Sequence, residues 1–236
     1  MVMTAAWLVM FPVLAGIIGA VIAVLRPPTP AVVSGVQHFA AGVVLAAVAG
    51  EVLPQLSDRG PLWLIVVGFA GGVAVLVGMR HLGGEESSPG ARGLPVGFLI
   101  VVGVDLFIDG LLVGTGAAVS AETATIIAIA LTVEVLFLSL SVALRLLESG
   151  ASRFVAAAIT AGLSLVVAVG AILGALLLRD AGDAALSLVL AFAAAALLWL
   201  VVEELLVEAH ETPERPWAAA MFFLGFLLLF CLEAIG

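Results

Sequence analysis

Residues 94–118 read LPVGFLIVVGVDLFIDGLLVGTGAA, and two aspartates, Asp105 and Asp109, interrupt an otherwise apolar run near its middle. A helix needs about 20 mostly apolar residues to cross the hydrocarbon core of a bilayer. The stretch therefore predicts a membrane-spanning helix that carries two carboxylates at midmembrane depth. Because these aspartates are four residues apart, we expect them to share one helix face.

The rest of the chain has the same character. Its 236 residues are 64% apolar and 11% charged, whereas soluble domains are about 45–50% apolar and about 25% charged. The chain has seventeen acidic and eight basic residues, and all the basic ones are arginine. We therefore expect no surface that binds a nucleic-acid phosphate backbone. One cysteine, Cys231, excludes an internal disulfide and a cysteine-built metal site. The composition predicts a helical membrane protein and excludes a soluble enzyme and a nucleic-acid binder.

Proline, glycine and charged residues divide the chain into about eight apolar runs. We expect an all-α, polytopic membrane protein forming one transmembrane domain over residues 1–236, with its longest loop at residues 83–93. The expected spans are residues 4–25, 31–53, 61–81, 94–118, 123–147, 153–178, 184–208 and 216–234.

The arginines predict an orientation, because short loops rich in arginine stay cytoplasmic. In an eight-span arrangement one side holds only Arg59 and Arg179. The other side holds six arginines: Arg26, Arg80, Arg92, Arg145, Arg153 and Arg215. We therefore expect a multi-pass protein of a prokaryotic plasma membrane, with both termini outside and the loop at residues 83–93 inside.

A third carboxylate, Glu134, lies near the middle of the fifth run. At a rise of about 1.5 Å per residue, it should reach the same depth as Asp105 and Asp109. No basic residue lies near the middle of any run. Such acids can be protonated and bonded to a neighbouring helix, face water, or bind a cation. An oxygen-rich cluster suits Mg, Ca or Mn better than a metal that prefers thiolate.

Further acids and a histidine lie nearer the ends of the runs. Glu51 is near the outer end of the second run, where an ion would enter. Glu204, Glu208 and Glu211 recur at helical spacing near the inner end of the seventh run, next to Glu203 and His210. His38 lies at the inner end of the second run. We expect Glu204, Glu208 and His38 on the side where an ion leaves, although solvated helix ends explain acids there equally well.

Three motifs resemble the ZIP (Zrt-, Irt-like) metal transporters, most closely their bacterial GufA-like branch. Residues 38–47, HFAAGVVLAA, look like the family's second helix, and residues 200–210, LVVEELLVEAH, are similar to its seventh. Residues 105–114, DLFIDGLLVG, align with the fourth-helix signature HNFPEGLAVG. The resemblance implies a ZIP-like bundle of eight helices, termini outside, and metal transport.

The departures from the ZIP pattern are concentrated at the paired metal site that the family's fourth and fifth helices supply. Asp105 stands in place of the family's histidine, Asp109 in place of its glutamate, and Glu134 in place of the first fifth-helix ligand. The prolines that break both helices are absent, which predicts intact helices with side chains as the main ligands. The family's other metal position is occupied by apolar residues, namely Leu106, Val135, Leu138 and Val167.

The first interpretation is transport of a divalent cation (Zn, Mn, Fe(II), Mg or similar) through a single site of Asp105, Asp109 and Glu134, by alternating access. Alternatives are a proton-coupled transporter of another substrate and a metal sensor that does not transport. An intramembrane aspartyl protease is a weaker option, and we expect no enzyme. The expected partners are the bilayer and the ion, which is substrate rather than cofactor, with a homodimer as one option.

Overall fold

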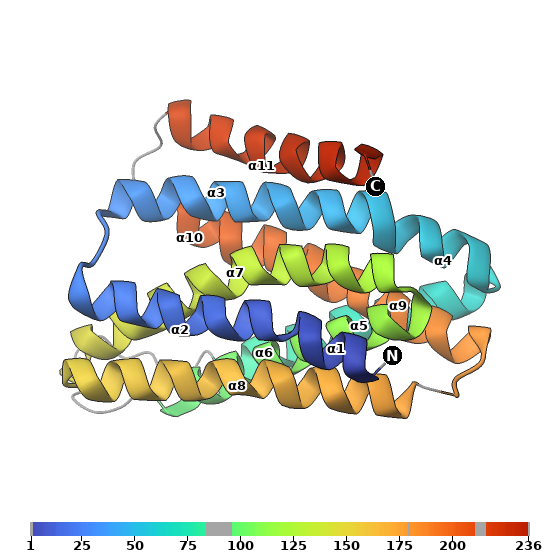
Figure 1. Cartoon of the computed structure of the whole chain (residues 1–236), viewed down its shortest axis with the longest axis horizontal. Coiled ribbons are helices and arrows are strands. Elements are labelled where there is room, and N and C mark those ends of the chain that lie inside the picture. The colour runs from blue at the N-terminus through green and yellow to red at the C-terminus, as the bar shows by residue number, and fades with distance from the viewer. Residues whose placement is uncertain (1, 84–95, 179, 211–215, 236) are drawn as a thin grey trace.

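The computed structural model describes residues 2–83, 96–178, 180–210 and 216–235, and every regular element among them is a helix. Figure 1 shows these helices running roughly along one long axis, with α3 and α11 at one edge of the bundle and α8 at the opposite edge. In chain order the elements are α1 (Val2–Leu8), α2 (Met10–Leu25), α3 (Pro30–Ala47), η1 (Val48–Val52), α4 (Leu53–Arg59), α5 (Leu62–Gly83), α6 (Val96–Val119), α7 (Ala121–Glu148), α8 (Arg153–Leu177), α9 (Asp183–Trp199), η2 (Leu200–Leu205), α10 (Leu206–His210) and α11 (Pro216–Ile235).

Six of the described helical runs are long and apolar enough to cross a membrane, and two apolar helices are shorter, at Leu62–Gly78 and Pro216–Leu232. Large apolar side chains cover the outside of the bundle, for example Phe154, Leu177 and Phe223, as expected of a surface that faces lipid. The prediction of an all-helical, multi-pass membrane protein is confirmed at this level. The loop expected at residues 83–93 lies, after Gly83, outside the described residues.

Local sequence signals set most helix ends. Pro30 begins α3, where its missing N–H costs no helix bond. Ser120 caps α7 by accepting a hydrogen bond from the Thr123 N–H at 2.9 Å, and Ser152 caps α8 in the same way. Gly150, with φ of +93°, follows the end of α7 in the left-handed conformation that glycine adopts without strain.

Two of the long helical runs contain a π-helical turn. α3 passes through η1 into α4, and α9 passes through η2 into α10. The helix continues to Arg59, six residues beyond residue 53, where the second span was expected to end. Pro54 cannot donate the helix bond that an α-helix needs at its position, and the wider turn just before it accommodates that loss.

The helix contacts follow the same pattern twice when α2, α3 and α5 are matched with α8, α9 and α11, and α7 is matched with α6. α3 packs against α11 as α9 packs against α5, and α2 packs against α7 as α8 packs against α6. α3 and α9 correspond in this exchange, and each is the helix that runs into a π turn. The helices before α6 and those after α7 are thus two similar units of sequence that interlock in the bundle, because α3 contacts α11 and α5 contacts α9.

Glycines bring α6 and α8 into backbone contact. A Cβ added at Gly110 would lie 2.1 Å from the Val167 carbonyl oxygen, and one at Gly170 would lie 2.2 Å from the Phe107 oxygen. The small-residue motifs at Gly110/Gly114 and Gly170/Gly174 therefore pack against each other, as small residues at helix interfaces in membranes commonly do. This contact fixes the rotation of α6, and with it the direction in which Asp109 points.

Candidate metal centre

The structure brings Asp105, Asp109 and Glu134 together. Each offers one carboxylate oxygen, and these three oxygens lie within 4.8 Å of one another. Asp105 and Asp109 flank the middle of α6, and Glu134 lies at the middle of α7. The prediction that the three acids meet at one depth, halfway along the two helices, is confirmed.

No donor from the described residues outside the trio reaches its buried oxygens. Glu134 is 0% exposed and Asp109 is 4% exposed, while Asp105 is half-buried. Both oxygens of Glu134 and one oxygen of each aspartate are buried and have no hydrogen-bond partner. Because a buried polar atom without a partner costs about 1–3 kcal/mol, this arrangement calls for a group that the three acids can bind together.

The helices that carry the trio are unbroken. α6 and α7 run as continuous α-helices through the site, as the missing prolines predicted. Their backbone carbonyls are engaged in the helices, so side-chain oxygens are the ligands available here. The residues at the family's second metal position pack in the apolar core: Leu106, Val135 and Val167 are fully buried or nearly so, and Leu138 is half-buried.

Glu204 lies nearer to the trio than its place in the sequence predicted. It sits in the π turn η2, within electrostatic range of the Asp109 and Glu134 carboxylates. The expectation that Glu204, Glu208 and Glu211 share one face assumed a regular α-helix, and the π turn changes the number of residues per turn. Glu208 lies in α10, but its side chain and all of Glu211 are outside the described residues.

Glu51 is held by hydrogen bonds in the π turn η1. Thr123 donates its hydroxyl to Glu51 Oε1 at 2.5 Å, and the Gln55 side chain donates to the same oxygen at 3.4 Å. Thr123 is buried in the first turn of α7, beside the capping residue Ser120. The carboxylate expected where an ion enters therefore ties η1 to the N-terminus of the helix that carries Glu134, where the helix dipole favours negative charge.

His38 and His210 form a pair at another position in the bundle. Their ring centroids are 5.2 Å apart, and each Nδ1 donates to a carbonyl of its own helix, His38 to Ser34 and His210 to Leu206. Ser34 also donates its hydroxyl to the Ala209 carbonyl at 2.7 Å, which links α3 to α10. His38 was expected among the residues where an ion leaves. Its pairing with His210 was not predicted, because the two histidines are far apart in sequence.

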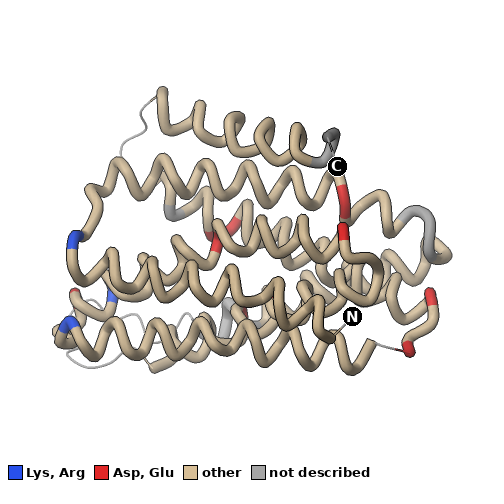
Figure 2. The backbone as a smooth tube through the Cα atoms, in the orientation of Figure 1, with Lys and Arg blue, Asp and Glu red and all other residues tan. Residues whose placement is uncertain are grey.

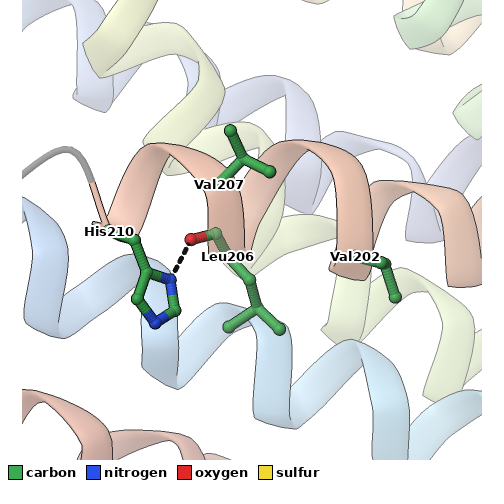
Figure 3. A pocket seen from close by; sticks show the side chains of 4 residues that line it. All are labelled: Val202, Leu206, Val207 and His210. Carbon is green, nitrogen blue, oxygen red and sulfur yellow. Dashed lines mark hydrogen bonds between the residues drawn. The ribbon is translucent and has the colours of Figure 1, made fainter.

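An open pocket lies beside His210. Figure 3 shows Val202, Leu206 and Val207 lining it with His210, whose Nδ1 reaches the Leu206 carbonyl while the other ring nitrogen points away from the helix. Because a carbonyl only accepts hydrogen bonds, Nδ1 carries the proton and Nε2 carries the lone pair. A ring fixed in this way is oriented as metal-binding imidazoles commonly are.

The described arginines gather at one end of the bundle, whereas acidic residues are spread along it. Figure 2 shows the blue segments, all arginine in this lysine-free chain, at one end of the bundle. Red segments lie at the other end and near the middle. Arg26, Arg145 and Arg153 are the arginines whose side chains the structure describes. Arg59 and Arg179, expected on the opposite side, have side chains outside the described part, so the orientation stays a prediction. No protein-family model matches the chain, and a search of curated proteins found no match.

Proposed function

We propose that the protein carries a divalent metal cation across a membrane through the site formed by Asp105, Asp109 and Glu134. The observation that supports this most directly is the meeting of three buried carboxylates halfway along two long apolar helices, with oxygens that have no hydrogen-bond partner. A cation compensates such a cluster, and intramembrane acids commonly mark ion pathways.

The architecture supports transport over passive binding. Eight spans, with α5 and α11 counted among them, would place three spans before the central pair and three after it. The two similar units would then lie in opposite orientations in the membrane, a design common in secondary transporters. Such transporters bind their substrate near the midplane, and here the trio lies halfway along the central pair.

The remaining polar groups suggest a route. An ion would pass Glu51, bind the trio, and leave past Glu204, Glu208 and the His38–His210 pair. The π turns η1 and η2 place Glu51 and Glu204 on the two units, and π turns inside helices occur frequently at functional sites. With the arginine-rich end cytoplasmic, both termini lie outside, in the plasma membrane of a prokaryote, and the ZIP-like motifs agree with this topology.

Uptake into proteoliposomes tests the proposal. The full-length protein would be compared with an Asp105→Asn/Asp109→Asn double variant, which keeps size and shape but removes two charges. Glu148→Gln, an exposed acid in the last turn of α7, serves as the matched control. We expect uptake of at least one of Mn²⁺, Zn²⁺, Fe²⁺, Cd²⁺ and Mg²⁺ by the protein and by the control, and none by the double variant.

Two other outcomes separate the alternatives. Metal binding without uptake, in folded and inserted protein, would indicate a sensor. Proton flux without metal binding or uptake would indicate a proton-coupled transporter of another substrate. Either result contradicts the proposed metal transport.

A further inference from the structure

The donor set at the trio consists of oxygen only. Asp105, Asp109 and Glu134 supply carboxylates, and the unbroken helices α6 and α7 supply no carbonyl. The two histidines whose side chains the structure describes, His38 and His210, pair with each other on α3 and α10. The single cysteine, Cys231, lies exposed on α11, which packs against α3. No imidazole or thiolate of the described residues therefore joins the three oxygens.

The size of the cluster suits a six-coordinate cation. Ligand oxygens opposite each other on Mg²⁺ lie about 4.2 Å apart, and on Ca²⁺ about 4.6–5.2 Å apart. The three oxygens of the trio already lie within 4.8 Å of one another, so a shared ion requires movements below about 1 Å. Asp105 is half-buried, and its side of the site is where water can complete the shell.

Apolar packing keeps other ligands away. Leu106 and Val135 directly follow two of the ligands in sequence, and both are buried, at 1% and 0% exposed. Val167, on the helix that packs closest to α6, is also 0% exposed. The site thus offers three hard oxygens and water, with apolar residues on these sides and the Glu204 carboxylate within electrostatic range. Carboxylate and water ligands suit Mg, Ca and Mn.

We propose that this site takes hard, six-coordinate divalent cations, represented by Mn²⁺ and Mg²⁺, and favours the softer Zn²⁺ and Cd²⁺ less than tenfold over Mn²⁺. The inference rests on the proposed function only in using the same three ligands as the place where the ion binds. Imidazole and thiolate ligands normally raise the affinity of protein sites for Zn²⁺ above that for Mn²⁺. Without them, coordination number and charge decide which ion binds.

Competition against bound Mn²⁺ tests this inference. Loss of the free Mn²⁺ signal in electron paramagnetic resonance measures binding to the full-length protein in detergent, and Mg²⁺, Zn²⁺ and Cd²⁺ are then added as competitors. We expect Mn²⁺ to bind, and Zn²⁺ and Cd²⁺ to displace it with inhibition constants no more than tenfold below the Kd of Mn²⁺. Asp105→His, which replaces one oxygen donor with imidazole nitrogen, should lower the Zn²⁺ and Cd²⁺ concentrations needed by tenfold or more.

The outcomes distinguish this inference from the proposed function. If Zn²⁺ or Cd²⁺ displaces Mn²⁺ from the unaltered protein with an inhibition constant more than tenfold below the Kd of Mn²⁺, the hard-cation inference is overturned. Metal transport is left standing by that result. Absence of binding of any of the four ions to folded, monodisperse protein contradicts both. Glu148→Gln is the control and should bind as the unaltered protein does. The competition on the unaltered protein decides the inference even where Asp105→His does not fold.

Discussion

Replacing Glu134 by leucine should stabilise the protein while removing its response to metal. Glu134 is 0% exposed, and neither of its oxygens has a hydrogen-bond partner. A buried polar group without a partner costs about 1–3 kcal/mol, and leucine fits the apolar wall around it. We therefore expect the free energy of unfolding of metal-free Glu134→Leu to rise by about 1–3 kcal/mol. A functional residue that costs stability typically gives this result.

The metal-bound protein should behave in the opposite way. An ion at 100 times its Kd stabilises the folded state by about 2.7 kcal/mol, and Glu134→Leu, with one of three ligands gone, should lose most of that gain. Thermal unfolding in detergent, followed by the fluorescence of the four tryptophans, measures both effects. For a chain of this size 1 kcal/mol corresponds to about 2–4 °C in Tm.

A matched variant and a clear contrary result make the experiment decisive. Glu148→Leu changes an exposed acid on the same helix. Its free energy of unfolding should stay within about 0.5 kcal/mol of that of the unaltered protein, and its response to metal should remain. If metal-free Glu134→Leu unfolds at a lower temperature than the unaltered protein, the carboxyl holds helices together as a protonated, hydrogen-bonded group. The reasoning from an uncompensated carboxylate would then be refuted.

Three further outcomes are expected. Gly110→Ala should lower the free energy of unfolding by about 1–3 kcal/mol, because its Cβ would lie 2.1 Å from a backbone oxygen of α8. Gly162→Ala, with open space at its position, should raise the free energy of unfolding by about 0.5–1 kcal/mol. Thr123→Val removes the donor to Glu51 and should cost about 1.5–3 kcal/mol in chemical unfolding, while Thr125→Val, whose hydroxyl bonds only its own helix, should cost less. Chelation of metal from loaded protein should lower Tm by the amount that metal addition raises it, and an unchanged Tm would contradict binding.

The sequence allowed the trio to be predicted because the relevant signals are local. Apolar length fixed the helices α6 and α7, and the positions of Asp105, Asp109 and Glu134 within them fixed their depth. The same reasoning predicted that both helices continue through the site, because neither contains a proline there.

The π turns and the contacts made across the bundle could not be predicted in this way. Hydrophobic periodicity assumes regular α-helix, so the shift of Glu204 towards the trio had no signal in the pattern. Pro54, three residues after Glu51, was the one sign that η1 departs from α-helical geometry. The hydrogen bond from Thr123 to Glu51 and the pairing of His38 with His210 join residues far apart in sequence, and they depend on how helices rotate against each other.

The packing pattern has a mechanical consequence for the site. Helices α2, α6, α7 and α8 contact one another directly, whereas α3 with α11 and α5 with α9 pair outside them. All three carboxylates belong to the inner set, and the two π turns belong to the outer one. A displacement between these sets would therefore move the trio as a rigid unit, with the separations between its oxygens preserved. If the protein transports metal as proposed, the coordination geometry would be conserved while the solvent-facing surroundings of the ion change.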